Sequence, residues 1–114
     1  MHEMALVQSM IEIVEQEMAQ HHVNNVKAIH LAVGRMTCVV PEQMTLCFEI
    51  LTHNKPLAGA ELKMKMVPVT YQCRVCNREF TSEGITSDCP YCKRKYPELI
   101  AGRELQIEFL EVED

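Results

Sequence analysis

Two closely spaced cysteine pairs constrain this chain more than any other feature of its sequence. They are Cys73-Arg74-Val75-Cys76 and Cys89-Pro90-Tyr91-Cys92, separated by residues 77–88. Two such turns can bring four thiolates around one ion, which is the closed tetrahedral geometry that zinc adopts in structural sites. The spacing therefore predicts a zinc site made by Cys73, Cys76, Cys89 and Cys92. The alternative is two redox dithiols, but thioredoxin-like enzymes place one such motif between a strand and a helix of a larger fold.

The segment that holds these pairs, residues 71–102, contains few aliphatic side chains. It cannot bury enough apolar surface to fold alone, so we expect the metal to hold it together. A closed four-sulfur site leaves no position for water or substrate, which predicts a contribution to folding and none to catalysis. We therefore expect a zinc-ribbon domain over 71–102, inserted into a second domain made by 1–70 and 103–114.

Two segments outside the ribbon have helical periodicity. From Glu3 to about His22, apolar residues recur every three or four positions and predict an amphipathic helix; they are Leu6, Val7, Met10, Ile13, Val14 and Met18. Pro41 suits the first turn of a second helix that continues to about Asn54. The apolar face of that helix holds Met44, Cys47, Phe48 and Leu51.

Three further segments alternate apolar and polar residues, as strands with one buried face do. The first contains Ile29, Leu31 and Val33 and ends at Gly34; the second contains Leu62, Met64 and Met66 and ends before Pro68. The third alternates through Leu105, Ile107 and Phe109 and then shifts phase to Leu110 and Val112, which predicts a bulge or a change of packing partner. The expected fold class is α+β, with two helices on a small three-stranded sheet and an inserted four-cysteine zinc ribbon.

The formal net charge of −5 disfavours nonspecific attraction to nucleic acid or anionic lipid. No apolar run is long enough to span a membrane and no signal peptide is evident, so we expect a cytoplasmic protein with reduced thiols. Lys93-Arg94-Lys95 lies beside the second cysteine pair, as in ribbons that bind nucleic acid, but acidic residues nearly balance the basic ones over 71–102. A zinc-ribbon interaction or nucleic-acid-binding module with no second metal site is the alternative function, although this charge balance disfavours nucleic acid.

The first residues, Met1-His2-Glu3, contain a second candidate metal site. Because His2 is large, we expect Met1 to be retained with a free amine. That amine, the deprotonated amide of His2 and the His2 imidazole can form a five-membered and a six-membered chelate ring. This planar nitrogen set suits Ni(II) or Cu(II) and suits zinc poorly, and the Glu3 amide or another donor could complete the plane.

The other cysteines and histidines have no partners at recognisable spacing. Cys47 fits the packed face of the second helix, whereas the role of Cys38 stays open. His21 and His22 fit the end of the first helix, and His30 and His53 suggest no site. Since there is also no phosphate-binding glycine loop and no nucleophile with a histidine base, we expect no enzyme.

Several short motifs occur in order along the chain: Met1-His2-Glu3, Val33-Gly34, Cys38-Val39, Phe48-Glu49-Ile50, Glu61-Leu62, the two cysteine pairs and Gly102-Arg103-Glu104-Leu105. Together they resemble the HypA/HybF family of nickel chaperones for hydrogenase maturation. One departure is that Asn77 and Lys93 stand where the family often has glycine after each cysteine pair. Either residue can adopt the required turn, asparagine more easily.

The resemblance implies one transported nickel held by Met1, His2 and Glu3, and one structural zinc held by the four ribbon cysteines. It also implies a HypB-type GTPase and the large subunit precursor of NiFe hydrogenase as partners, while some members serve urease. The family fold is a two-helix, three-stranded nickel domain with a zinc ribbon inserted before the last strand. The protein would act as a monomer or homodimer; a competing possibility is an adaptor that contacts a GTPase through its acidic surface.

Overall fold

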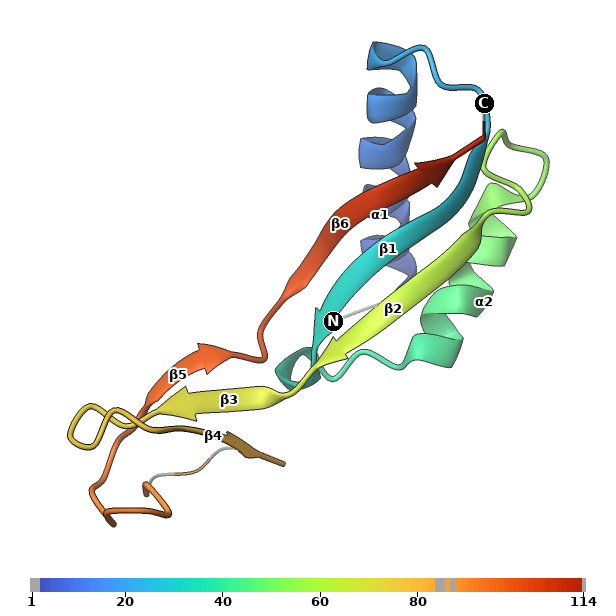
Figure 1. The fold of residues 1–114 in the computed structure, drawn as a ribbon. Helices are drawn as coiled ribbons and strands as arrows, with labels where there is room; N and C mark the ends of the chain where they lie inside the picture. The colour runs from blue at the N-terminus through green and yellow to red at the C-terminus, as the bar shows by residue number, and fades with distance from the viewer. Residues whose placement is uncertain (1–2, 84–85, 87, 114) are drawn as a thin grey trace. The chain divides into compact units, whose positions relative to one another are not determined.

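The computed structural model describes residues 3–83, 86 and 88–113, and it has the predicted α+β fold (Figure 1). The elements follow in the order α1 (Glu3–Gln20), β1 (Val26–Gly34), a 3-10 helix (Arg35–Thr37), α2 (Pro41–Thr52), β2 (Glu61–Val67), β3 (Val69–Gln72), β4 (Glu79–Ser82), β5 (Glu98–Ala101) and β6 (Leu105–Val112). They form one sheet in the order β2-β1-β6 and another in the order β4-β3-β5. In the part of the chain described, no helix is both long and apolar enough to cross a membrane.

The chain divides into two compact units. The helix–sheet unit consists of Met1–Leu31, Val39–Lys65 and Gln106–Asp114, and the ribbon unit consists of Ala32–Cys38 and Met66–Leu105. The functional division expected from the sequence, 1–70 with 103–114 against 71–102, stays a prediction.

Helix α1 buries one stripe of side chains, made by Val7, Met10, Ile11, Val14 and Met18. The sequence prediction was wrong at one position of this face, because Ile13 is 51% exposed and Ile11 is 2% exposed. Val7, Ile11, Val14 and Met18 repeat at intervals of four, three and four, which is the straightest stripe along a helix. Ile13 lies to the side of that stripe.

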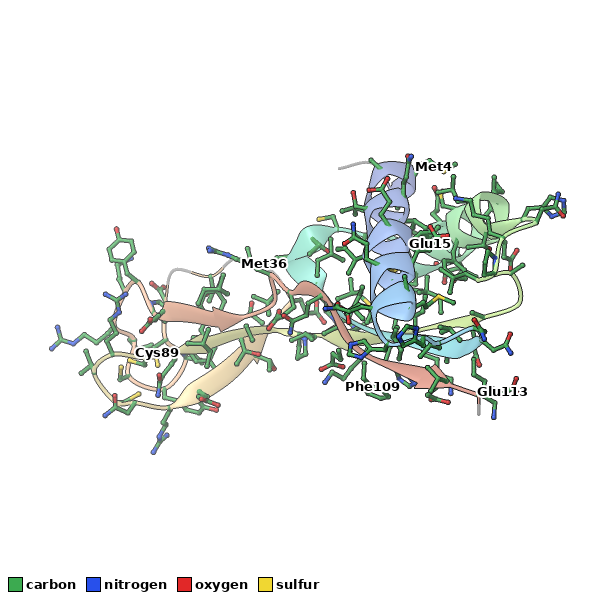
Figure 2. The ribbon with its side chains drawn as sticks, turned by 90° about the horizontal axis from the view of Figure 1, so that it is seen from above. Met4, Glu15, Met36, Cys89, Phe109 and Glu113 are labelled. Atoms are coloured by element: carbon green, nitrogen blue, oxygen red, sulfur yellow. The ribbon has the colours of Figure 1, made fainter. Side chains whose placement is uncertain are left out.

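Strand β1 is the centre of the first sheet, and both helices lie on one face of that sheet (Figures 1 and 2). Its larger apolar side chains, Ile29, Leu31 and Val33, are almost fully buried, and Met44 and Phe48 of α2 are buried as well. The alternate positions of β1 include the small residues Ala28 and Ala32 and the half-buried His30. A central strand with one aliphatic face and one face of mostly small residues suits a sheet covered by helices on one side only.

The phase of β6 changes as the sequence suggests. Leu105 and Ile107 are half-buried and Phe109 is exposed, but Leu110, three positions after Ile107, is half-buried again. In a regular strand, residues three positions apart point to opposite faces, so this burial pattern fits a local irregularity in edge strand β6.

Two glycines allow a close backbone approach within the ribbon unit. A Cβ on Gly34 would lie 2.1 Å from the Gly102 carbonyl oxygen, although Gly34 has an ordinary extended conformation. Gly102 has a φ of +122°, and a Cβ there would lie 2.9 Å from the Cα of Val69. The Met36 amide donates to the Gly102 carbonyl at 2.8 Å. Gly34, at the end of β1, must be glycine because a side chain there would clash with the backbone of Gly102. Gly102 favours glycine because its φ is positive.

The ribbon unit contains a small antiparallel sheet that the sequence did not predict. β3 pairs with β4 and β5, with Tyr71 opposite Phe80 and Leu99. Tyr71 is buried and its ring stacks on Phe80 with centroids 5.6 Å apart. Strands of four residues give too short an alternation to recognise in sequence, so this sheet became visible only in the structure.

Candidate metal centre

The first cysteine pair forms the tip of the β3–β4 hairpin. The Cys73 amide donates to the Arg78 carbonyl at 3.0 Å, and the Asn77 amide donates to the Cys73 carbonyl at 2.9 Å. Within the turn, the amides of Val75 and Cys76 lie 3.4 and 3.5 Å from the Cys73 sulfur. The turn therefore aims two backbone donors at one sulfur and exposes the residues between the cysteines.

The second cysteine pair repeats this geometry in a shorter hairpin closed by a bridge between Asp88 and Lys95. The Cys89 amide donates to the Arg94 carbonyl at 2.8 Å, and the Lys93 amide donates to the Cys89 carbonyl at 3.0 Å. Asn77 and Lys93, at equivalent positions, have φ values of 61° and 66°. Both residues thus adopt the left-handed conformation that glycine adopts more readily.

The two turns bring all four predicted ligands together. The sulfurs of Cys73 and Cys92 are 3.4 Å apart, those of Cys76 and Cys89 are 3.8 Å apart, and all four lie within 4.8 Å of one another. Cys73 and Cys89 are buried, whereas Cys76 and Cys92 are half-buried; the label in Figure 2 marks Cys89. The cluster is closed on the protein side and reaches solvent through the second cysteine of each pair.

Backbone amides favour the thiolate form at the buried cysteines. Hydrogen bonds from the Cys76 and Val75 amides lower the pKa of the Cys73 thiol to about 6. At Cys89 the largest single effect is burial, which raises the pKa, but the backbone amides of its own turn outweigh burial and the net pKa is lowered. The leading cysteine of each pair is therefore prepared to act as an anionic ligand.

The Cys92 thiol is harder to ionise than a free thiol, because other cysteine sulfurs lie beside it. The Arg94 amide is the largest influence on Cys92 and lowers its pKa, but burial and the thiols of Cys73 and Cys89 raise that pKa to about 11. Neighbouring like charges disfavour ionisation of all four groups together. A divalent cation at the centre would remove this conflict, and among the described residues no other group of three or more histidine, cysteine or acidic side chains converges in this way.

The donor set and its spacing fit zinc. Zinc–sulfur bonds of about 2.3 Å in a tetrahedron place sulfurs about 3.8 Å apart, and two of the separations here are 3.4 and 3.8 Å. Four sulfurs fill the coordination sphere that zinc prefers in structural sites.

Of the predicted nickel ligands, Met1 and His2 lie outside the described residues, and Glu3 is the first residue of α1. A Glu3 carboxylate oxygen lies 3.5 Å from the amide of Val40. Val40 is the N-cap of α2 and its own side chain makes no capping hydrogen bond. The Glu3 carboxylate therefore lies at the positive end of the α2 dipole, a placement that the sequence did not suggest.

The remaining cysteines lie apart from the four-sulfur cluster in sequence and in environment. Cys38 is exposed, with a φ of 58°, at the end of the 3-10 helix. Cys47 is half-buried on α2, which is less than the packing expected of it. Beside the end of α1, His21 lies 3.3 Å from Glu17, and His53 is exposed just beyond α2. None of these side chains joins a metal-ligand cluster within the ranges that the structure describes.

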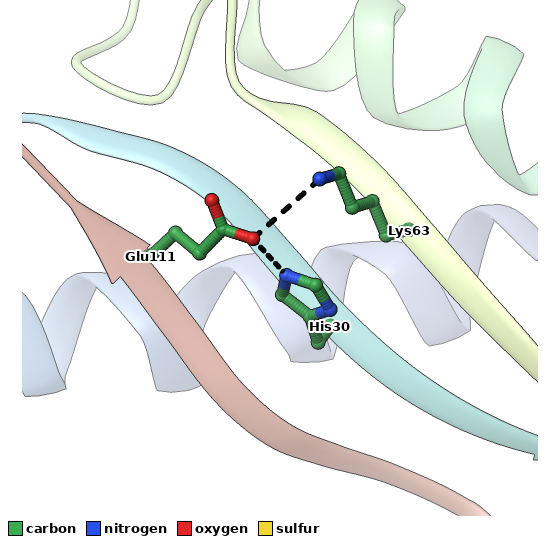
Figure 3. Close-up of polar contacts among 3 residues, drawn as sticks. All are labelled: His30, Lys63 and Glu111. Carbon is green, nitrogen blue, oxygen red and sulfur yellow. Dashed lines mark hydrogen bonds and ion pairs between the residues drawn. The ribbon is translucent and has the colours of Figure 1, made fainter.

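His30 has a partner that the sequence did not reveal. On the sheet face away from the helices, its Nε2 atom lies 2.5 Å from Glu111 Oε1, and Lys63 Nζ lies 3.5 Å from the same oxygen (Figure 3). The His30 ring also stacks on Phe109, with centroids 3.9 Å apart. The three polar residues come from β1, β6 and β2, so this contact joins all three strands of the sheet. The hydrogen bond to His30, the largest effect, lowers the pKa of Glu111, and Lys63 adds to it.

Sequence comparison finds one family over almost the whole chain. The family described as "Hydrogenase/urease nickel incorporation, metallochaperone, hypA" matches residues 1–112. A hydrogenase maturation factor HypA from Solidesulfovibrio magneticus is 40% identical, with 99% of this chain and all of the relative aligned. Another from Desulfitobacterium hafniense is 36% identical over the full length of both.

A solved structure has the same fold. The solution structure of the Ni metallochaperone HypA from Helicobacter pylori matches with a TM-score of 0.66 and 19% identity, covering 98% of this chain and 97% of the other. The arrangement of the two helices and the sheets is thus a fold seen before.

Proposed function

Because the chain belongs to the HypA family of metallochaperones for nickel incorporation into hydrogenase and urease, we propose that it binds Ni(II) at its N-terminus and delivers it for maturation of NiFe hydrogenase. The observation that carries this proposal is the family match, which begins at residue 1 and ends at residue 112. Members of this family are maturation factors and not catalytic enzymes. The chemistry required of the chain is therefore to hold a metal ion and to release it.

We further propose that Cys73, Cys76, Cys89 and Cys92 hold a structural zinc ion. The convergence of four sulfurs, the amide groups aimed at them and the conflict between neighbouring thiolates support this assignment. Zinc would supply the positive charge that lets all four thiolates coexist. A closed set of four sulfurs is a poor site for a transported ion, since release would require the ribbon to lose its cross-link.

The proposed nickel ligands are Met1, His2 and Glu3. The support is chemical: an amine, an amide nitrogen and an imidazole form the planar nitrogen set that Ni(II) favours. Glu3 adds a structural argument, because its carboxylate is near the amide of Val40 at the start of α2. That contact would fix the start of α1 against α2.

We propose, as the sequence predicts, that residues 1–70 and 103–114 form the nickel-binding domain and that residues 71–102 form the zinc-binding domain. A HypB-type GTPase and the large subunit precursor of NiFe hydrogenase are the proposed partners. The proposed location is the cytoplasm, where both partners would be met and the thiols would stay reduced.

The test is a nickel titration of zinc-loaded wild-type protein and of His2→Ala. We expect His2→Ala to weaken nickel binding by roughly a hundredfold or more, since it removes one chelate ring and an imidazole ligand. His21→Ala is the matched control, because His21 is an exposed helix-end histidine whose partner is Glu17. A chain with extra residues before Met1 should also bind nickel poorly, since it lacks the free amine at that position.

Equal nickel affinity of folded, zinc-loaded His2→Ala and wild type would refute the N-terminal site. Sulfur-to-nickel charge-transfer absorption from the ribbon cysteines would refute the separation of the two metals. Retention of zinc in each variant, measured by metal analysis, distinguishes loss of the nickel site from loss of the fold.

A further inference from the structure

The outer face of helix α2 presents two large aliphatic side chains to solvent. Leu46 is 57% exposed and Ile50 is 55% exposed, more than any other aliphatic side chain that the structure describes in the helix–sheet unit. The buried side chains of α2 are Met44, Phe48 and Thr52. At about 100° per residue, Leu46 and Ile50 lie on the side of the helix opposite these three.

Leu46 and Ile50 form one apolar patch, because residues four positions apart are neighbours on a helix surface. Apolar side chains scattered singly over a surface are ordinary, whereas adjacent ones bordered by polar residues are typical of interaction sites. Packing within the helix–sheet unit does not account for these two residues, since they point away from the sheet that α2 covers (Figure 1). The patch is therefore available to another molecule.

Two carboxylates border the patch. Glu42 is four positions before Leu46 and Glu49 is three positions after it, so both lie beside Leu46 on the same helix face. Both glutamates are exposed. In the part of the chain that the structure describes, neither forms an ion pair, and α2 contains no lysine or arginine. The negative charge beside the patch is thus free to attract a cation.

The neighbouring helix has charge of the same sign. Helix α1 lies on the same side of the sheet as α2 and contains Glu3, Glu12, Glu15 and Glu17, again without a lysine or arginine (Figures 1 and 2). A layer of two helices with glutamates and no lysine or arginine attracts a basic surface and repels an acidic one. The charge of the helix layer therefore indicates a basic partner.

We propose that the outer face of α2 binds an amphipathic helix of a partner protein in which lysine or arginine borders an aliphatic stripe. The aliphatic stripe packs on Leu46 and Ile50, and the cations face Glu42 and Glu49. One partner helix can reach all four side chains, because they share one face of α2. This inference goes beyond the proposed function and does not depend on where either metal binds.

A second copy of this chain is a poorer occupant of the same face. Packing α2 against α2 would bring Glu42 and Glu49 of both copies together, with no lysine or arginine on either helix. Like charges that face each other across an interface oppose association. Nucleic acid and anionic lipid are disfavoured by the same charges.

The test titrates a blocked helical peptide into the zinc-loaded full-length chain. The peptide has leucine at every third or fourth position and lysine beside the leucines, and the buffer contains about 0.15 M salt to screen distant charges. We expect binding, with the largest amide chemical-shift changes in α2. Matched peptides with serine in place of leucine, or glutamate in place of lysine, should bind roughly tenfold more weakly, because each lacks one of the two contacts.

Variants of the two helices then locate the site. Leu46→Ser should weaken peptide binding roughly fivefold, whereas Ile13→Ser, at an isoleucine of α1 that is 51% exposed, should change it less than about twofold. Glu49→Gln should weaken binding roughly threefold and reduce its salt dependence, and Glu12→Gln, with the same change of charge on α1, should have little effect. Unchanged circular dichroism of each variant shows that the fold is retained.

Absence of peptide binding would overturn the proposal. Equal weakening by the variants of α1 and α2 would also overturn it, because the peptide would then be attracted by acidic charge in general. Binding that is indifferent to the exchange of leucine for serine would exclude the apolar contact. A concentration-dependent dimer of the wild type that Leu46→Ser abolishes would assign the face to a second copy and contradict the proposal.

Discussion

Lys93 and Asn77 close the two cysteine turns in the same left-handed backbone conformation, with φ values of 66° and 61°. For a residue with a Cβ this conformation costs about 1–2 kcal/mol, less for asparagine. Glycine relieves that strain but loses more conformational entropy on folding. The balance should be favourable at Lys93 and close to neutral at Asn77.

Lys93→Gly should therefore stabilise the zinc-loaded ribbon by about 0.5–1 kcal/mol. The measurement is competition for zinc with a chelator of known affinity, with pH and free zinc held constant. Lys93→Ala is the control, since it removes the same charge but retains the Cβ, and it should give little gain. An equal gain in both variants would mean that the lysine charge, and not the backbone, had opposed zinc binding.

At the residue scale, the sequence was most informative where chemistry depends on near neighbours. The convergence of the four ribbon cysteines follows from the spacing within each pair, and the turns at Asn77 and Lys93 follow from the resemblance to a family that often has glycine there. The contact between His30 and Glu111 does not, because the two residues are 81 positions apart and meet only through the strand order β2-β1-β6. The assignment of Ile13 to the buried face of α1 was wrong, because periodicity alone does not show where the centre of the buried stripe lies on a helix.

At the scale of elements, the polar contact among His30, Glu111 and Lys63 holds the edge strand β6 to the rest of the sheet. The pKa of Glu111 in the folded chain is below its ordinary value of 4.5, chiefly because of the hydrogen bond to His30. A group with a lowered folded pKa contributes stability that is fully present above its unfolded pKa. That contribution is lost as the pH falls through the folded value.

Glu111→Gln should consequently lower the urea midpoint of the helix–sheet unit at pH 7, and the difference from wild type should shrink as the pH falls below 4.5. Paired measurements at each pH cancel any loss of zinc that both proteins share. Glu113→Gln, at an exposed position just beyond β6, should leave the midpoint unchanged throughout. A pH-independent difference for Glu111→Gln would assign its effect to packing and not to ionisation.

The elements themselves were predictable to different degrees. α1, α2 and the three strands of the first sheet have long, regular patterns because each must bury one face against the others. The phase change in β6 was readable because Leu110 breaks an otherwise strict alternation. The strands β3, β4 and β5 were missed because each has only four residues, and their pairing depends on the cysteine turns that join them.

For the whole molecule, the two units differ in what holds them together. The helix–sheet unit has a core of aliphatic and aromatic side chains such as Val14, Ile29 and Phe48, whereas the buried positions of the ribbon include Cys73 and Cys89 themselves. If these cysteines hold zinc as proposed, the metal is a large part of the ribbon's folding free energy and a small part of that of the other unit.

Removal of zinc by a strong chelator should therefore unfold the ribbon and leave the helix–sheet unit folded. In hydrogen exchange, amides of 71–102 should approach the rates of an unfolded chain, while those of α1 and β1 should change by less than roughly twofold. Cys73→Ser should reproduce this pattern without chelator, and Cys38→Ser, at an exposed cysteine outside the cluster, should not. Nickel binding that survives in Cys73→Ser would show that the cargo site folds and works without the ribbon. Unfolding of both units together on zinc removal would instead make the metal a cross-link for the entire chain and contradict the proposed division.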